Sequence, residues 1–215
     1  MIKRFRFYFY LFFISNSAFA DDVFLHHLNA DTDYAFKETV TSLTKNKVTH
    51  GEFEQIRTLK SQKKTLKSSG NFIIANGLGI VWQTLKPFAS TIAVGKDFVI
   101  QTSTSGKKTK LDSSTAGEAF LKISGMISII FSGDALKILD AYDVFFYKDK
   151  SEWQMGLIPN DKTLSTILSK ITVQGNNDVI NYIKMEGGNG DITEYFMSSQ
   201  TFAATLTSDE KSLFI

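Results

Sequence analysis

Three histidines and two pairs of carboxylates are the residues of this sequence that could support acid–base catalysis or metal binding. The histidines are His26, His27 and His50, and the carboxylate pairs are Glu52 with Glu54 and Asp191 with Glu194. Two carboxylates held together in a cleft can divide the roles of general acid and general base. No histidine, however, lies in a motif such as H-E-x-x-H that would hold zinc. We therefore expect solvated histidines and no metal site.

Motifs for nucleophilic or phosphate chemistry are absent from the sequence. There is no G-x-S-x-G elbow, no phosphate-binding loop and no cysteine. The run "GGNGD" at residues 187–191 lacks the regular carboxylate spacing of a calcium loop, and no helical pattern follows it. It is interpreted as a hairpin turn. We expect no catalytic residues, no cofactor and no enzymatic activity.

The first twenty residues have the pattern of an export signal. Lys3, Arg4 and Arg6 precede an apolar run over residues 7–14, and Ala18-Phe19-Ala20 is a small-x-small cleavage site. The apolar run is well short of the ~20 residues that span a bilayer. We expect residues 1–20 to be a signal peptide cleaved after Ala20, and residues 21–215 to be one periplasmic domain.

The charge of the mature chain argues against nucleic-acid binding. The full chain has 24 Lys and Arg against 22 Asp and Glu, and cleavage removes three basic residues, leaving 21 against 22. A near-neutral domain has no electrostatic footprint for a phosphate backbone. Without a cysteine no lipid anchor can be attached after the signal, so a soluble product is expected.

Helical and strand patterns divide the first half of the chain. Residues 32–44 place Tyr34, Phe36, Val40 and Leu43 near helical spacing, with Asp31 as the predicted N-cap. After this helix, short runs rich in Phe, Ile, Val and Thr predict strands at residues 52–59, 66–75, 78–84, 90–94 and 97–102. The Asn76-Gly77 pair predicts a tight hairpin turn with positive φ angles.

The second half returns to strands after a helical segment. Residues 115–139 indicate two short helices separated near Ser132-Gly133, with Ser132 capping the second. Strands are predicted at residues 142–147, 152–158, 164–173, 179–186 and 192–198, with turns at residues 175–178 and 187–191. Roughly ten strands with helices at the start and in the middle favour one highly curved antiparallel α+β sheet or barrel.

Consecutive apolar residues are the unusual feature of the predicted hairpin around Asn76-Gly77. The segments "FIIA" and "GIVW" are apolar on both faces, so either both faces are covered or one of them lines a cavity. Alternation places Ile80, Trp82 and Thr84 on one face. Val81 and Gln83 lie on the other face, and the polar Gln83 indicates that this face is exposed to solvent. Trp82 is therefore expected on the concave side of the sheet.

Several short motifs resemble the periplasmic outer-membrane lipoprotein carrier family, LolA. They are "GEFEQ" at residues 51–55, "SSGNF" at 68–72, "GIVWQTLKPF" at 79–88, "EWQMGLIP" at 152–159 and "GDITEYF" at 190–196. Their order along almost the whole mature chain also fits. One difference is that the chain has Asn76-Gly77 in the stretch before the tryptophan, where family members often have an Arg-Pro pair.

The resemblance implies an incomplete antiparallel β-barrel, a half-pipe sheet closed by helices around a hydrophobic cavity. In this sequence the cavity residues would be Phe53, Phe72, Ile74, Ile80, Trp82, Ile92, Phe98 and Ile100, and the lid would comprise Phe120, Ile123, Ile127, Ile130 and Phe131. It further implies a monomeric carrier of acylated cargo, either lipoprotein or, in a divergent branch, glycolipid. An inner-membrane transporter would be the donor and an outer-membrane protein the acceptor.

Two other functional classes stay open at this point. A periplasmic enzyme acting on lipid or on a cell-envelope polymer would need one of the carboxylate pairs in its cleft. A structural envelope module without cargo would have a barrel filled by side chains, and every candidate cavity residue could equally be core. An apolar internal cavity favours the carrier, and converging carboxylates favour the enzyme.

Overall fold

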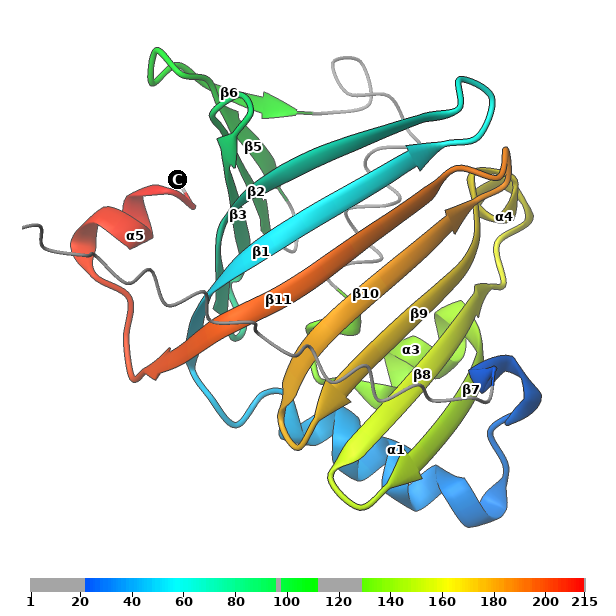
Figure 1. Cartoon of the computed structure of the whole chain (residues 1–215). Helices are drawn as coiled ribbons and strands as arrows, with labels where there is room; N and C mark the ends of the chain where they lie inside the picture. The colour runs from blue at the N-terminus through cyan, green and yellow to red at the C-terminus, as the bar shows by residue number, and fades with distance from the viewer. Residues whose placement is uncertain (1–21, 96–97, 112–128, 215) are drawn as a thin grey trace, which may run out of the picture.

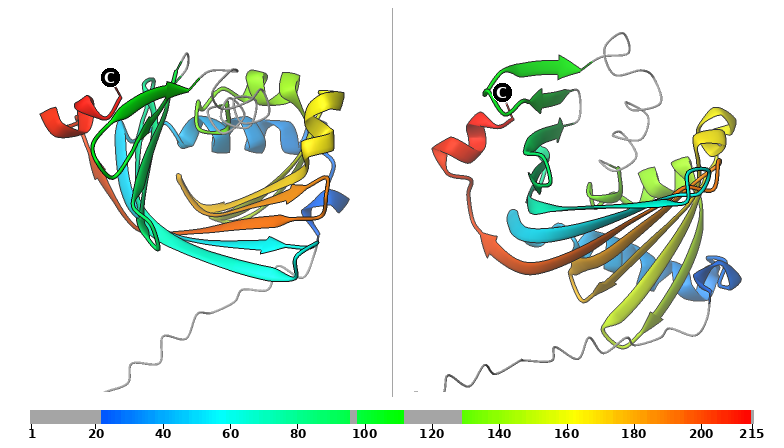
Figure 2. Two further views of the ribbon diagram at one scale, coloured as in Figure 1. Left: turned by 90° about the horizontal axis from the view of Figure 1, so that it is seen from above. Right: turned by 45° about the horizontal axis from the view of Figure 1, so that its top comes forward.

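One antiparallel sheet forms the body of the protein. The structure, a computed structural model, describes residues 22–95, 98–111 and 129–214. Within them, eleven strands follow the order β6-β5-β4-β3-β2-β1-β11-β10-β9-β8-β7. Figures 1 and 2 show that this sheet curls into a half-pipe whose two edge strands, β6 and β7, do not meet. The α+β class and the open, curved antiparallel sheet are thus confirmed.

The strands correspond closely to the apolar, β-branched runs of the sequence. The first half contains β1 (Val48–Leu59), β2 (Lys64–Ala75), β3 (Gly79–Lys86), β4 (Ser90–Gly95), β5 (Val99–Thr102) and β6 (Lys108–Leu111). The second half contains β7 (Tyr142–Asp149), β8 (Glu152–Pro159), β9 (Leu168–Asn176), β10 (Val179–Gly187) and β11 (Ile192–Ala203). Pairing of β1 with β11 joins the two halves.

Helices lie on both sides of this sheet. The described ones are η1 (Val23–Leu25), α1 (Ala30–Ser42), α3 (Ala135–Ala141), α4 (Lys162–Ile167) and α5 (Ser208–Ser212). Figure 2 shows α1 and α3 over the concave face and α5 outside the half-pipe, near the C-terminus. None of the helices in the described ranges combines the length and the apolar character needed to cross a bilayer.

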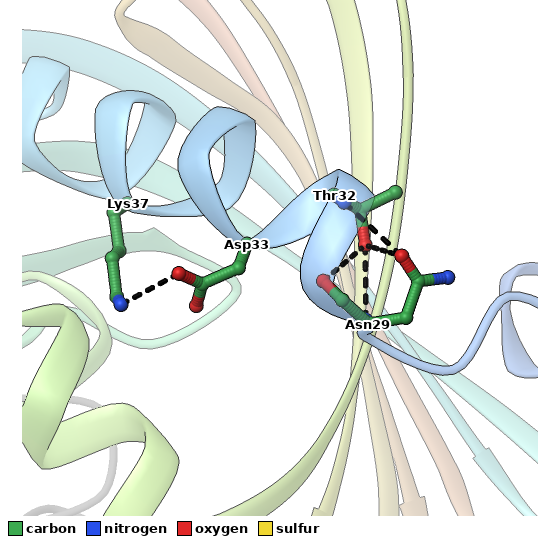
Figure 3. Close-up of polar contacts among 4 residues, drawn as sticks. All are labelled: Asn29, Thr32, Asp33 and Lys37. Carbon is green, nitrogen blue, oxygen red and sulfur yellow. Dashed lines mark hydrogen bonds and ion pairs between the residues drawn. The ribbon is translucent and has the colours of Figure 1, made fainter.

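Helix α1 begins two residues earlier than expected, at a different cap. The Asn29 side chain accepts hydrogen bonds from the amides of Asp31 and Thr32, and Thr32 Oγ1 accepts from the Asn29 amide (Figure 3). This reciprocal capping box satisfies the free amides of the first turn. Asp31, the predicted cap, lies inside the helix. Lys37 and Asp33 form an i, i+4 ion pair at 2.7 Å on its outer side.

Two hydrophobic clusters occupy the two faces of the sheet. The larger one lies on the concave face and joins Phe36 and Val40 of α1 and Ile138 of α3 to inward residues of the sheet. The smaller one lies on the opposite face, where Phe214 covers Val81 and Ile73. Both faces of the β2–β3 hairpin are therefore buried, which is one of the two explanations that the sequence left open.

Three local predictions are wrong, two because a helix cap was missed and one because a strand depends on its partner. Residues 164–173 divide into α4, which Asp161 caps by accepting from the Leu164 amide, and β9. Strand β6 was not predicted, since its lysine-rich sequence resembles a loop. Asp134, not Ser132, caps α3. The first part of the predicted helical segment, residues 115–128, lies outside the described residues.

The β2–β3 hairpin turns at the expected place with a different backbone. Gly77 has a φ of 78°, whereas Asn76 does not have positive φ. The Leu78 amide donates to the Ala75 carbonyl at 3.0 Å, which closes the turn. The Asn76 side chain instead donates to the Thr44 carbonyl at 2.8 Å, so it ties the turn to the segment after α1.

Candidate functional site

An aromatic cluster lies on the concave face of the sheet. The indole ring of Trp82 lies 4.8 Å from the ring of Phe53, 5.7 Å from that of Phe72 and 5.1 Å from that of Tyr195. The register explains this arrangement, because Phe72 is directly opposite Trp82 in the β2–β3 pair. Gly51, opposite Phe72, leaves space for its ring: a Cβ there would lie 2.4 Å from Phe72 Cζ.

The aromatic cluster is only partly closed. Phe53 and Phe72 are buried, whereas Trp82 and Tyr195 keep part of their surface accessible. Burial raises the pKa of the Tyr195 phenol to about 12, with Arg57 acting in the opposite direction, so this hydroxyl is neutral near pH 7. The buried Nε1 of Trp82 has no hydrogen-bond partner among the described residues. The cluster thus offers apolar surface with an unused donor.

A larger pocket opens at one end of the concave face. Its volume is about 760 Å³, within the range of ~300–1,000 Å³ typical of small-molecule sites. Its walls come from the β2–β3 hairpin, from residues 129–132, from α3 and from the segment between β8 and α4. The apolar part of the wall includes Ile74, Ile80, Ile129, Phe131, Tyr142 and Leu164. These side chains suit a hydrocarbon ligand.

Polar groups in this pocket are few, and most lie at the rim. Lys137, Asp140 and Asp161 contribute charges, and Lys137 is paired with Asp134 at 2.9 Å. Hydrogen bonds from Lys137 hold the pKa of the Asp134 carboxyl below its ordinary value. Deeper in the wall, burial raises the pKa of the Tyr142 phenol well above its usual range. The arrangement is mainly apolar, with its charged side chains toward solvent.

A second pocket lies on the opposite face of the sheet, beneath α5. Its volume is about 510 Å³, and its lining includes His50, Gln83, Glu210 and Leu213. His50 Nε2 lies 2.7 Å from Glu210 Oε1, which joins strand β1 to α5. This pocket is smaller and lies beneath α5 with the charged side chains of Asp209 and Glu210 in its lining, so it is not the candidate lipid site.

The comparisons with known proteins agree with this architecture. Residues 44–211 match the family described as outer membrane lipoprotein carrier protein LolA. The chain belongs to the LolA family. No curated protein sequence matches the chain.

Several solved structures align with most of this chain at low sequence identity. A LolA superfamily protein from Nitrosomonas europaea has 8% identity and a TM-score of 0.48, covering 86% of this chain and 97% of its own. A DUF1329 family protein from Desulfovibrio piger has 10% identity and a TM-score of 0.47, covering 82% and 94%. LprF from Mycobacterium bovis has 11% identity and a TM-score of 0.43, covering 84% and 97%.

Most of the residues proposed from the LolA resemblance lie on the concave face. Phe53 and Phe72 are buried in the concave cluster, Trp82 packs against it, and Ile92 is directly opposite Trp82 in the β3–β4 pair. Ile74 and Ile80 line the large pocket. Their role in binding a ligand stays a prediction.

Two of the proposed cavity residues are on the wrong face. Ile100 is directly opposite Ala93 in the β4–β5 pair, and both belong to the outer cluster with Val81. Phe98 packs against the same cluster. The error arose because the hairpin register, which the sequence does not show, puts Ile92 and Ile100 on opposite faces. The face of β3 that carries Val81 and Gln83 was expected to be exposed to solvent. This is wrong for Val81, which is fully buried.

The proposed lid is only partly within the described residues. Ile130 is buried in the concave cluster, and Phe131 lines the large pocket. Phe120, Ile123 and Ile127 lie outside the described residues. Sequence reasoning missed Tyr142, Leu164 and Tyr195, which lie on the concave side. The sequence could not identify them, because an inward-facing aromatic residue or leucine that lines a pocket has the same pattern as one that packs in the core.

The carboxylates and histidines do not gather into a catalytic group in the described part of the chain. Glu52 accepts from Ser199 Oγ, Glu194 accepts from Tyr182, and Asp191 accepts from the Lys60 amide. No set of three or more His, Asp or Glu side chains at metal-binding distance occurs there. His27 Nε2 lies 2.7 Å from Asp143, at the sheet edge formed by β7. These groups connect structural elements.

Proposed function

We propose that this LolA-family protein is a periplasmic carrier that binds the acyl chains of a lipoprotein or another acylated lipid. The signal-like residues 1–20 would direct export, and residues 21–215 would form the mature carrier domain. An inner-membrane transporter would load the carrier, and an outer-membrane acceptor would receive the cargo. The carrier would act as a monomer.

The observation that carries this proposal is the apolar pocket of about 760 Å³ at the concave face. Removing hydrocarbon from water is worth roughly 0.8 kcal/mol per CH₂ group before ordering costs are subtracted. A carrier needs such a surface and needs neither a nucleophile nor a metal. The partly accessible Trp82 and Tyr195 extend apolar surface from the aromatic cluster along the same face.

Displacement of a fluorescent acyl probe tests the proposal. A diacylated lipopeptide is expected to displace the probe, and the same peptide without its acyl chains is not. Equal displacement by both peptides would show that no acyl-selective site exists.

A pair of tryptophan substitutions locates the site. Ile74→Trp replaces an aliphatic side chain in the wall of the pocket with a bulky indole ring and should weaken lipopeptide binding about ten-fold or more, because the ring takes volume from the ligand. Leu85→Trp, at an exposed position of the same β2–β3 hairpin, is the matched control and should leave binding unchanged. Equal effects of the two substitutions would exclude this pocket as the acyl site.

A further inference from the structure

The hydroxyl group of Tyr142 is buried without a partner. Tyr142 is the first residue of β7, and 2% of its surface is exposed. Its hydroxyl oxygen makes no hydrogen bond within the described residues. Buried tyrosine hydroxyls normally find a partner, because desolvating a donor without compensation is unfavourable. A phenylalanine at this position would bury the same ring without that penalty.

The surroundings of Tyr142 offer little to satisfy this donor. The wall of the pocket beside it includes the apolar side chains of Ala141 and Leu164, which offer no acceptor. Tyr142 itself lines the pocket. An unused donor in the wall of an apolar pocket matches the general design of ligand sites, in which a few polar groups fix orientation.

The Tyr142 hydroxyl is a donor at all physiological pH values. Desolvation raises the pKa of its phenol, because burial disfavours the phenolate. The group therefore stays neutral and keeps its proton. A neutral donor pairs well with a neutral acceptor, such as the carbonyl oxygen of an ester or amide.

We propose that the Tyr142 hydroxyl donates a hydrogen bond to the carbonyl of an acyl ester or amide bound in this pocket. The inference rests on the proposed carrier function and adds a recognition group to it. It makes Tyr142 a specificity residue that distinguishes an acyl carbonyl from a bare alkyl chain of the same length.

Charges at the rim favour a neutral acyl group over an anionic one. Asp140 and Asp161 line the pocket with one cationic side chain, Lys137, and that ammonium is already paired with Asp134. Among the lining residues, two carboxylates therefore stand against one ammonium group. A free fatty acid or a phosphate near this rim would meet repulsion, whereas the ester of a glyceride or the amide of an N-acyl group would not.

The test compares two lipids of equal chain length, palmitoylglycerol and hexadecylglycerol, which differ in the carbonyl group. Both are titrated against a fluorescent acyl probe on the mature wild-type protein. The ester is expected to bind about ten-fold more tightly, which corresponds to about 1.4 kcal/mol. Tyr142→Phe should abolish this preference by weakening ester binding while leaving ether binding unchanged.

Tyr182→Phe is the matched control. The Tyr182 hydroxyl donates to Glu194 at 2.7 Å, and Tyr182 does not line the pocket. This variant should keep the wild-type ratio of affinities. An unchanged ratio in Tyr142→Phe would overturn the inference while leaving the carrier function intact. Failure of both lipids to bind the wild-type protein would instead overturn the carrier function, and the inference with it.

A second measurement does not depend on a substitution. The infrared carbonyl band of isotope-labelled palmitoylglycerol should shift to lower frequency on binding to the wild-type protein, as a hydrogen-bonded carbonyl does. An unshifted band in the bound state would overturn the inference even if Tyr142→Phe did not fold.

Two further lipids test whether the acyl ester comes from a lipoprotein or from a phospholipid. A dipalmitoylglyceryl lipopeptide and dipalmitoyl phosphatidylglycerol both carry the acyl ester, but only the second carries a phosphate. The lipopeptide should compete better because of the rim carboxylates, and its affinity should fall in Tyr142→Phe. If Tyr142→Phe bound both lipids as tightly as the wild-type protein does, the inference would be overturned.

Discussion

Val81 and Trp82 are adjacent in strand β3, yet their side chains enter separate hydrophobic clusters on opposite faces of the sheet. Val81 is fully buried in the cluster that Phe214 closes from outside. The indole ring of Trp82 lies 4.8 Å from the ring of Phe53 on the concave face. This strand therefore separates the C-terminal segment from the candidate lipid site, and substitutions can address the two faces independently.

Trp82 is expected to report ligand binding through its fluorescence. In a Trp153→Phe background, its emission should shift when a diacylated lipopeptide is added, because the indole is partly accessible on the concave face. Trp82→Phe should keep the fold and weaken lipopeptide binding about three- to ten-fold, roughly 0.7–1.4 kcal/mol.

The second tryptophan is the internal control for this measurement. Trp153 is fully buried, and its Nε1 donates to the Asn177 carbonyl at 2.9 Å, so its emission in Trp82→Phe should not respond to the lipopeptide. A response from Trp153 alone would place the ligand elsewhere. Constant emission from Trp82 at saturation, with unaltered affinity in Trp82→Phe, would assign Trp82 to the static core.

Helix α1 is expected to be held on the sheet mainly by Phe36. This side chain has no exposed surface and meets Phe146 edge-on at 5.6 Å. Phe36→Ala should lower the free energy of unfolding by about 3–5 kcal/mol, because it leaves a cavity between α1 and β7. Tyr34→Ala, on the exposed side of the same helix, should change it by less than about 0.5 kcal/mol. Urea denaturation measures the free energy of unfolding of both variants. Equal decreases would show that Phe36 does not hold α1 on the sheet.

The start of α1 depends on Asn29. Asn29→Ala removes the side chain that accepts from two amides of the first turn, and it should lower the free energy of unfolding by about 1 kcal/mol. Asp31→Ala removes only a favourable interaction with the helix dipole, so it should lower the free energy of unfolding by roughly 0.3–0.5 kcal/mol. Thermal unfolding of the two variants compares them directly. A larger loss for Asp31→Ala would contradict the observed cap.

Docking of α5 is expected to weaken in acid. Hydrogen bonding to the Thr207 amide, followed by interaction with His50, lowers the pKa of the Glu210 carboxyl. Because the folded pKa lies below the unfolded one, ionised Glu210 stabilises the docked helix above its ordinary pKa of about 4.3. That contribution is lost as the pH falls through the lowered value.

NMR signals of Phe214 follow this transition, because its ring is buried only while the C-terminal segment is docked. They should move toward unfolded positions as the pH falls below the ordinary pKa of a glutamate, about 4.3, in the wild-type protein. Glu210→Gln should weaken docking at neutral pH and remove the acid dependence, whereas Glu54→Gln, an exposed carboxylate of the same strand as His50, should retain it. An identical acid profile in Glu210→Gln would show that another group controls docking.

Local patterns were sufficient to predict most strands of this fold. The β-branched and aromatic runs around Phe72 and Trp82, and the glycine at the 76–77 turn, prefer extended strands and a tight reversal in any context. The weakest predictions were at β6 and α4, where a lysine-rich strand is supported by pairing with β5 and a short helix by the Asp161 cap. Such support comes from partners that a local pattern does not contain.

The sequence by itself determined that the β2–β3 hairpin is apolar at consecutive positions, that Trp82 alternates with Val81, and that the short motifs are those of the LolA family. Only the tertiary structure decided which face each strand presents to the concavity, because a shift of one residue in register moves a whole set of side chains to the other face. That is why Ile92 and Ile100 separate. The tertiary structure also brought Tyr142 beside Ile74 and Ile80 in one pocket, since these residues are distant in sequence and meet only when the sheet curls under α3.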